Sequence, residues 1–443
     1  PNPARVLALG FAAVILLGSV LLSLPVAWEP GQHLSYLDAL FTATSAVCVT
    51  GLLVTNTAET FSIFGEIVIM LLIQVGGLGV MTMSTLFAVL MGKRITFPER
   101  LVIQEALGQL SPAGVVRLAL YIALITLAFE SLGAVILTFH WWARYDMPLA
   151  LAAYRGLFHS VSAFNNAGFD LFSSDRPSLE RFAGDPVVTL VIAGLIIVGG
   201  IGFTVITDVA RAITHRRHRL SLHTRLVLWV TGILILVGTT IIALAEWRNP
   251  ETMGRLTPAA KILTAFFHAV TPRTAGFSML PKAELTAVTL VTTIVLMFIG
   301  GSPASTAGGI KTTTLGLLLA TVWATVRGEE EVVVLERRIP WATVAKALAL
   351  AVMAAGLVLA VTLLMLMVDG QPMLPTLFEV VSAFGTAGLS LGITPQLSLA
   401  GKLLIIATMY VGRVGPLTLA VALARRGRRP ALVRYPEERV LVG

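Results

Sequence analysis

The sequence predicts an all-α polytopic membrane protein built from four tandem repeats around a pseudo-fourfold axis. The 443 residues are 56% hydrophobic and only 13% charged, whereas a soluble domain carries roughly 25% charged residues. The sequence contains eight long apolar runs, and a shorter apolar piece lies between the two runs of each successive pair. Those shorter pieces share one residue pattern that recurs four times, which predicts the repeats.

The long runs are expected to be membrane spans, because about 20 apolar residues cross the hydrocarbon core. They lie near residues 4–24, 64–92, 114–141, 186–210, 224–245, 286–324, 341–368 and 401–424. The first run could be a signal peptide, but "SLPVAWEP" after it is a poor cleavage site. The sixth run is interrupted by glycines, a proline and hydroxyl residues, whereas the other second spans are expected to continue past their paired glycines.

The shorter pieces are predicted to be re-entrant half-helices, because about 10–15 residues cannot cross the membrane. They lie near residues 37–48, 150–164, 258–271 and 374–384. A glycine follows each one, and the four glycines recur every 108 to 117 residues: Gly51, Gly168, Gly276 and Gly388. The repeating unit is therefore span, pore helix, filter loop, span.

Two sets of segments carry the repeat. The half-helix segments "LFTATSAVCVTGL", "LFHSVSAFNNAGF", "AFFHAVTPRTAGF" and "LFEVVSAFGTAGL" align without gaps. Ser45, Ser162 and Ser382 match, and Val270 is the exception. The second spans contain "QVGGLG", "IVGGIG", "FIGGSP" and "YVGRVG", whose small residues indicate close helix packing.

These boundaries predict a linear division of the chain into four repeats and a tail. The units are 1–92 (repeat 1), 93–210 (cytosolic linker and repeat 2), 211–323 (linker and repeat 3, with an intramembrane gating loop at 300–312), 324–424 (linker and repeat 4) and 425–443 (basic cytosolic tail).

The net charge of +8 reflects topology and does not indicate a nucleic-acid partner. Most of the 32 Lys and Arg residues lie in the segments that follow the even-numbered spans, so the positive-inside rule predicts that both termini are cytoplasmic. The single cysteine, Cys48, excludes an intramolecular disulfide framework and a cysteine-based metal site.

Four half-helices that enter from outside would point their C-termini at the membrane centre. Each carbonyl end carries about half a negative charge, which favours a cation on the axis, and loop carbonyls can replace its water shell. Asp38, Glu59 and Asp170 near the outer mouth would raise the local cation concentration. The four loops contain no carboxylate, which favours a monovalent cation and predicts a pseudo-fourfold cation pore.

The motifs "TSAVCVTGL", "SAFNNAGF", "PRTAGF", "SAFGTAGL" and "GGSPASTAGGIKT" together resemble the superfamily of Trk, Ktr and HKT potassium transporters. The resemblance covers essentially the whole chain. Eight spans without an extra N-terminal pair are most similar to the Ktr-type bacterial membrane subunit. The resemblance implies a K⁺-conducting pore with one glycine in each filter strand, and Gly51 supports K⁺ because plant relatives with serine there favour Na⁺.

By position, the resemblance assigns the filter to four strands. Their side chains differ, so the group that coordinates the ion in all four strands must be the backbone carbonyl. The filter residues are Val49, Thr50, Gly51, Asn166, Ala167, Gly168, Thr274, Ala275, Gly276, Thr386, Ala387 and Gly388. Asn165, Asn166 and Arg273 break the fourfold symmetry. Glu379 is the expected partner of Arg273, which we interpret as a structural clamp on the filter because an unpaired charge at this depth is costly.

The resemblance assigns the interruption in repeat 3 to a loop that gates the pore. The gate residues are Gly300, Gly301, Ser302, Ser305, Thr306, Gly308, Gly309, Lys311 and Arg413. Lys311 would place a positive charge in the cation path when the pore is shut. Arg413 replaces the second glycine of the aligned motif in repeat 4, and it would help the loop to block the pore or would pair with buried carbonyls.

Three other functions fit parts of the sequence. Ser302, Ser305 and Lys311 suggest a Ser–Lys hydrolase, but an enzyme does not require a fourfold repeat, so we expect no enzymatic activity. A secondary transporter also uses broken helices, but its repeats would be inverted. The closest alternative is a Na⁺-selective or K⁺/Na⁺-cotransporting relative with the same fold.

K⁺ is the expected transported ion, with Na⁺ as the alternative, and no nucleotide-binding fingerprint occurs on this chain. The resemblance implies a homodimer in the bacterial inner membrane on a cytosolic ring of RCK-type nucleotide-binding regulatory subunits. The basic segments 211–225 and 425–439 offer a surface to that partner or to anionic membrane lipids.

Overall fold

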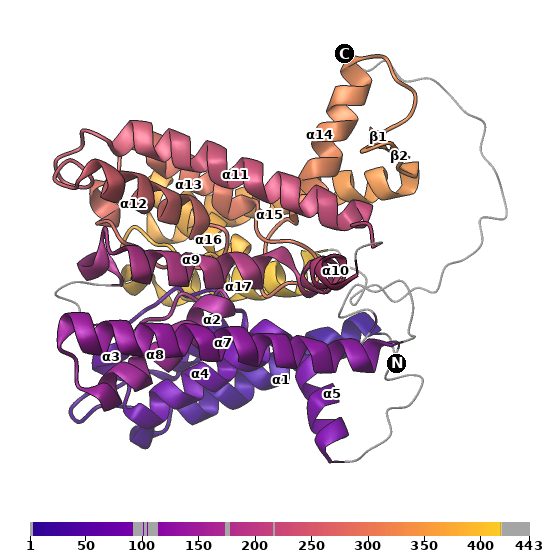
Figure 1. The fold of residues 1–443 in the computed structure, drawn as a ribbon. Helices are drawn as coiled ribbons and strands as arrows, with labels where there is room; N and C mark the ends of the chain where they lie inside the picture. Colours follow the sequence, from indigo (N-terminus) through magenta and orange to yellow (C-terminus); the bar gives the residue numbers. More distant parts are fainter. Residues whose placement is uncertain are drawn as a thin grey trace.

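The computed structural model describes residues 3–91, 101, 104, 114–172, 178–215, 218–416 and 418. Figure 1 shows long helices that run side by side, with shorter helices between them. The strands named in the described part form one antiparallel hairpin in the connection between the third and fourth repeats, with Val333 opposite Arg338. Its strands are β1 (Val333–Val334) and β2 (Arg337–Arg338).

Each repeat begins with a long apolar helix. These outer helices are α1 (Pro3–Leu22), α7 (Val115–Tyr145), α11 (Leu222–Glu246) and α15 (Trp341–Asp369). By length and composition, all four can cross a membrane. Large apolar side chains such as Leu124, Leu236 and Met367 are exposed on them, as expected for helices that face lipid.

The predicted half-helices form at the expected positions and lie among the longer helices. They are α2 (Tyr36–Val47), α8 (Leu149–Phe164), α12 (Pro258–Val270) and α16 (Met373–Gly385). Ser35 caps α2 by accepting from the Asp38 N–H, and Thr257 caps α12 by accepting from the Ala260 N–H. The last four residues of all four helices are buried, so these ends point into the protein.

The second helix is divided in the first three repeats, which the sequence predicted only for the third, and in the fourth repeat it ends at Val414 before Gly415. The inner helices are α4 (Ile63–Leu78), α9 (Pro186–Ile201), α13 (Ala287–Phe298) and α17 (Leu399–Val414). The first three are followed by α5 (Val80–Leu90), α10 (Phe203–Thr214) and α14 (Thr312–Val326). The predicted continuation of the fourth span to residue 424 lies largely outside the described residues.

The expectation that the other second spans continue as unbroken helices past their glycines is wrong. Gly79, Gly202 and Gly415 end their helices with φ of 84°, 97° and 93°, a region that favours glycine. The axes of α9 and α10 differ by 100°. In Figure 1, α5, α10 and α14 all lie at the same end of the molecule.

The first glycine of each aligned motif has a packing role, as the sequence predicted. A Cβ on Gly76 would collide with the carbonyl oxygen of Val47, the last residue of α2. Gly199 and Gly412 meet the corresponding carbonyls at the ends of the second and fourth pore helices. In the first, second and fourth repeats, glycine therefore lets the inner helix touch the end of its own pore helix, whereas Gly300 of the third repeat meets the backbone of Gly308 in the loop.

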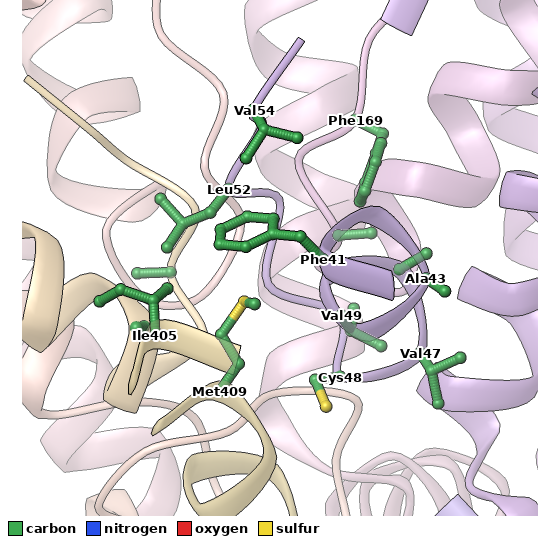
Figure 2. Packing of buried hydrophobic residues seen from close by; sticks show 14 of the residues in the cluster. Phe41, Ala43, Val47, Cys48, Val49, Leu52, Val54, Phe169, Ile405 and Met409 are labelled. Atoms are coloured by element: carbon green, nitrogen blue, oxygen red, sulfur yellow. The ribbon is translucent and has the colours of Figure 1, made fainter. Parts of the chain in front are cut away.

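Each inner helix also packs against the pore helix of the next repeat, in the order α4 on α8, α9 on α12, α13 on α16 and α17 on α2. Figure 2 shows the closing contact, where Ile405 and Met409 of α17 lie near Phe41 of α2. Phe41 and both α17 residues are fully buried. The four repeats therefore form a closed ring around one axis.

Short helices occupy the loops near the pore helices. These are η1 (Pro25–Ala27), α3 (Thr57–Thr60), η2 (Glu180–Phe182), η3 (Lys282–Glu284) and η4 (Thr394–Gln396).

Candidate functional site

The four repeat glycines meet in one closed ring. They line a common cavity of about 100 Å³, and their φ angles lie between 70° and 86°. A Cβ on Gly51 would collide with the carbonyl of Ala167, and one on Gly388 would collide with the carbonyl of Thr50. The same relation links Gly168 to the third strand and the third strand to the fourth. Both the backbone angle and the close approach of the strands therefore require glycine here.

The residue two positions before each glycine adopts a left-handed conformation that glycine normally favours. The φ angles are 56° for Val49, 59° for Asn166, 80° for Thr274 and 51° for Thr386. Three of these side chains are β-branched, for which a positive φ is unusual. The same strain, repeated four times at one place, is typical of a functional site.

Hydrogen bonds turn the N–H groups of the strands back toward the pore helices. The N–H groups of Thr50, Ala167 and Ala387 donate to carbonyls five residues earlier, at 2.7, 2.7 and 2.8 Å. The Gly51 N–H donates to Ser45 Oγ at 3.0 Å. In a trans peptide the preceding carbonyl points the opposite way. The carbonyls of the two residues before each glycine accept no hydrogen bond from described residues, so they are free to coordinate an ion.

In the third repeat the strand is also hydrogen-bonded to a hydroxyl residue near the end of the pore helix, but the residue is Thr271 and not the aligned Val270. Thr271 lies one position after Val270, and its backbone oxygen accepts from the Gly276 N–H at 3.3 Å. Thr271 Oγ1 donates to the Phe277 oxygen at 2.7 Å. Ser162 makes the matching bond in the second repeat. The signal in the sequence was a hydroxyl residue shifted by one position.

The charges at the outer mouth differ from those expected. Asp170 lines the cavity above the glycine ring. Asp38 does not line it and instead forms an ion pair with Lys402 at 2.7 Å. Glu59 lies on α3 and is not among the lining residues. Of the three expected acids, one therefore faces this cavity.

The expected pair between Arg273 and Glu379 does not form. Arg273 donates to Thr231 of α11 at 3.4 Å, and Glu379 accepts a short hydrogen bond from Thr394. Both charged side chains are buried. The guanidinium points toward the outer helix of its own repeat, where it can still hold the third filter strand in place.

The loop between α13 and α14 is bonded to the break in the second repeat. The Ser302 N–H donates to the Gly200 oxygen at 2.9 Å, and the Thr306 N–H donates to the Gly199 oxygen at 3.2 Å. The Phe203 N–H in turn donates to the Ala304 oxygen at 2.8 Å. Breaking a helix frees backbone groups, and the loop and the α9–α10 break satisfy each other's groups.

The same loop lies directly against the pore-helix ends. A Cβ on Gly308 would collide with Thr386 of the fourth filter strand. Thr306 Oγ1 donates to the oxygen of Phe164, the last residue of α8. A Cβ on Gly301 would collide with Ala307 inside the loop, and Gly309, with a φ of 66°, lies against the backbone of Gly300 and Gly385. The predicted gate glycines are therefore needed for close contact.

Within the loop, hydroxyl side chains hold the turn. Ser305 Oγ donates to the Ser302 oxygen at 2.7 Å, and Ser302 Oγ lies 2.8 Å from the hydroxyl of Thr312. Lys311 Nζ donates to the Ala307 oxygen at 2.8 Å. These contacts bind the loop to itself and do not pair Lys311 with a serine, as a Ser–Lys hydrolase would require.

Arg413 links three repeats. Its Nη1 atom donates to the oxygen of Thr306 in the loop, and its Nη2 atom donates to the oxygens of Gly76 and Gly77 at the end of α4. Arg413 and Lys311 both line two cavities of about 440 and 200 Å³ below the loop. The sequence predicted both a blocking and a pairing role for Arg413, and its bonds to carbonyls fit either one.

A buried network beside the ring was not predicted. Glu130 of α7 is 5% exposed and accepts from Asn165 Nδ2 at 2.8 Å and from Gln74 Nε2 at 3.2 Å. Asn165 Nδ2 also donates to the Gln74 side chain at 2.9 Å. A single acid inside a predicted span was the signal that marked this site.

Comparison with known proteins identifies similar chains. The model of the family described as "TrkH: Cation transport protein" matches residues 12–433. The chain is 43% identical over 442 residues to the "Ktr system potassium uptake protein B" of Bacillus subtilis, covering 100% of this chain and 97% of that protein. It is 39% identical to the "Potassium/sodium uptake protein NtpJ" of Enterococcus hirae, covering 100% and 97%.

The fold is similar to the crystal structure of the potassium transporter TrkH from Vibrio parahaemolyticus. The TM-score is 0.73 at 21% sequence identity, and the match covers 94% of this chain and 85% of that chain. At this identity the likeness concerns the fold.

Proposed function

The chain belongs to the TrkH family of cation transport proteins, and we propose that it is the K⁺-conducting membrane subunit of a Ktr/Trk-type uptake system. The observation that carries the proposal is the ring of four glycines, in which each glycine meets the next strand's carbonyl. The family is one of transporters and not an enzyme family. A 43% identical relative is named for potassium uptake.

In this proposal, backbone carbonyls select the ion that the pore conducts. Two carbonyls from each strand, four strands in all, replace the water shell of an ion on the axis. They precede Gly51, Gly168, Gly276 and Gly388. The C-terminal ends of α2, α8, α12 and α16 add their negative dipole ends. The filter strands carry no carboxylate, which favours a monovalent cation over a divalent one.

A K⁺/Na⁺ pathway is the second candidate. One relative with 39% identity is named as a potassium/sodium uptake protein. The same ring serves both functions, and the ratio of the two ions depends on carbonyl spacing and flexibility.

The loop between α13 and α14 is proposed as the gate. On one side, Gly308 of the loop contacts the fourth filter strand. On the other side lie the two cavities that Lys311 and Arg413 line. The positive charges of Lys311 and Arg413 beside a cation path oppose conduction while the loop holds this position. The proposed gate is the predicted segment 300–312 together with Arg413.

The assembly is proposed as a homodimer in the bacterial inner membrane, with both termini cytoplasmic, on a ring of nucleotide-binding regulatory subunits. The relatives' name "Ktr system" supports a system of several components. Each chain holds four repeats and so forms one pore. The repeat boundaries proposed from the sequence place one filter strand in each unit.

Ion flux into liposomes tests the function. The purified protein is reconstituted, and uptake is measured under equal inward gradients of K⁺ and Na⁺. We expect K⁺ uptake to exceed Na⁺ uptake and to be absent from protein-free liposomes. Equal fluxes favour the K⁺/Na⁺ candidate, and no flux of either ion contradicts both.

A further inference from the structure

The cavity above the glycine ring holds one base as well as one acid. Its charged lining residues are Asp170 and Lys282, and the other lining residues are neutral: Gly51, Leu53, Asn56, Thr57, Gly168, Ser178, Gly276 and Gly388. Lys282 begins η3, just after the third filter strand. An ammonium group therefore faces the same small space as all four filter glycines.

The ammonium of Lys282 differs from those of other lysines near the outer face. Lys261 Nζ donates to the Trp247 oxygen at 2.7 Å, and Lys402 Nζ forms an ion pair with Asp38. Lys282 is half-buried and has no hydrogen bond or ion pair within the described part of the chain. A lysine with only a structural role would be held by a partner or would extend its charge into water.

Three carboxylates interact electrostatically with Lys282. Burial lowers the pKa of Lys282, and the negative charges of Asp170, Glu180 and Glu379 oppose this shift. These charges favour the protonated ammonium in the mouth. The group therefore presents to the filter the same unit charge as the proposed transported ion.

We propose that Lys282 is a tethered competitor of K⁺ at the outer mouth and weakens the apparent affinity for external K⁺. This inference rests on the proposed function. An ammonium in the cavity repels an entering cation and shares with it the carboxylate of Asp170. A unit charge at this short range acts within a Debye length and is expected to change the local cation occupancy by about three- to tenfold at low ionic strength.

The test is the concentration dependence of K⁺ uptake into liposomes, with flux normalised to folded protein. Lys282→Gln removes the charge, and Lys282→Arg keeps it. Arg144→Gln is the matched control, because Arg144 is exposed in the last turn of the outer helix α7 and does not line the cavity. Each variant is measured at low and high ionic strength.

We expect Lys282→Gln to lower KM for external K⁺ about three- to tenfold at low ionic strength, with a smaller effect at high ionic strength and little change in maximal flux. Lys282→Arg and Arg144→Gln should keep the KM of the unmodified protein. An unchanged KM in Lys282→Gln, or an equal shift in Arg144→Gln, overturns the inference while leaving the proposed function intact. Absence of K⁺ flux from the unmodified protein overturns the proposed function itself.

Discussion

Arg413 at the end of α17 donates a hydrogen bond to the backbone oxygen of Thr306, in the loop between α13 and α14. The same guanidinium donates to the oxygens of Gly76 and Gly77 at the end of α4. One side chain of the fourth repeat therefore holds the loop of the third repeat against the first. A change at Arg413 should release the loop without altering the filter strands.

Replacing Arg413 by Ala is expected to raise K⁺ flux while the K⁺/Na⁺ ratio stays unchanged. The substitution removes a positive charge beside the cation path and the donors that hold Thr306. Flux per folded protein in liposomes is the measurement. A fall in flux with normal folding would mean that Arg413 supports the pore and does not close it.

Deleting residues 305–309 is also expected to raise flux, because the deletion removes Thr306 and Gly308, which contact two pore-helix ends. Combined with Arg413→Ala, the gain should be less than additive, since both changes act on one closed state. Fully additive gains, measured in the same liposome assay, would contradict a shared closed state.

Gly51→Ser is expected to narrow the difference between K⁺ and Na⁺ flux. The new Cβ would displace the Ala167 carbonyl, and the φ of 86° is strained for serine. Gly31→Ser is the matched control, because Gly31 has a φ of 88° with open space around it. If the K⁺/Na⁺ flux ratio changes equally in both variants, the glycine ring has no specific role in ion selection.

Thr271→Val should destabilise the third filter strand by about 1 kcal/mol, the typical net value of one hydrogen bond. The hydroxyl lost is the one that donates to the Phe277 oxygen. Thr292→Val is the control, because its hydroxyl bonds to Val288 on an exposed helix surface. Thermal unfolding and K⁺/Na⁺ selectivity are measured together, and equal effects of both substitutions would refute the role of Thr271.

Glu130→Leu should lower stability by about 1–3 kcal/mol, because Asn165 and Gln74 lose a buried acceptor. Glu130→Gln keeps an acceptor oxygen and should cost less. The two variants are compared by thermal unfolding in detergent. If leucine is tolerated as well as glutamine, the network does not support the ring.

Residue patterns predicted the four pore helices and the four glycines that meet in the ring, because apolar length and a repeated glycine are local properties of the chain. That each strand would contact the end of the pore helix before it could also be predicted, since each strand directly follows its own helix. The loop of repeat 3 was found because glycines, a proline and hydroxyl residues inside an apolar run leave few structural alternatives.

Long-range details could not be predicted. The breaks at Gly79 and Gly202 depend on how the inner helices meet their neighbours, since glycine within an apolar run also fits a continuous helix. The ion pair of Asp38 with Lys402 joins residues at opposite ends of the chain. The position of Lys282 over the ring depends on the fold of η3, which no periodic pattern in the sequence marks.

The central claim is that carbonyls of the four strands hold a monovalent cation on the axis. Anomalous diffraction from crystals grown with Rb⁺ or Tl⁺ in place of K⁺ tests it most directly. We predict an anomalous peak on the axis, within coordinating distance of the carbonyls of Thr50, Ala167, Ala275 and Ala387, and a weaker peak in Gly51→Ser. A well-ordered filter with no peak on the axis, or ions bound only elsewhere, would contradict the account.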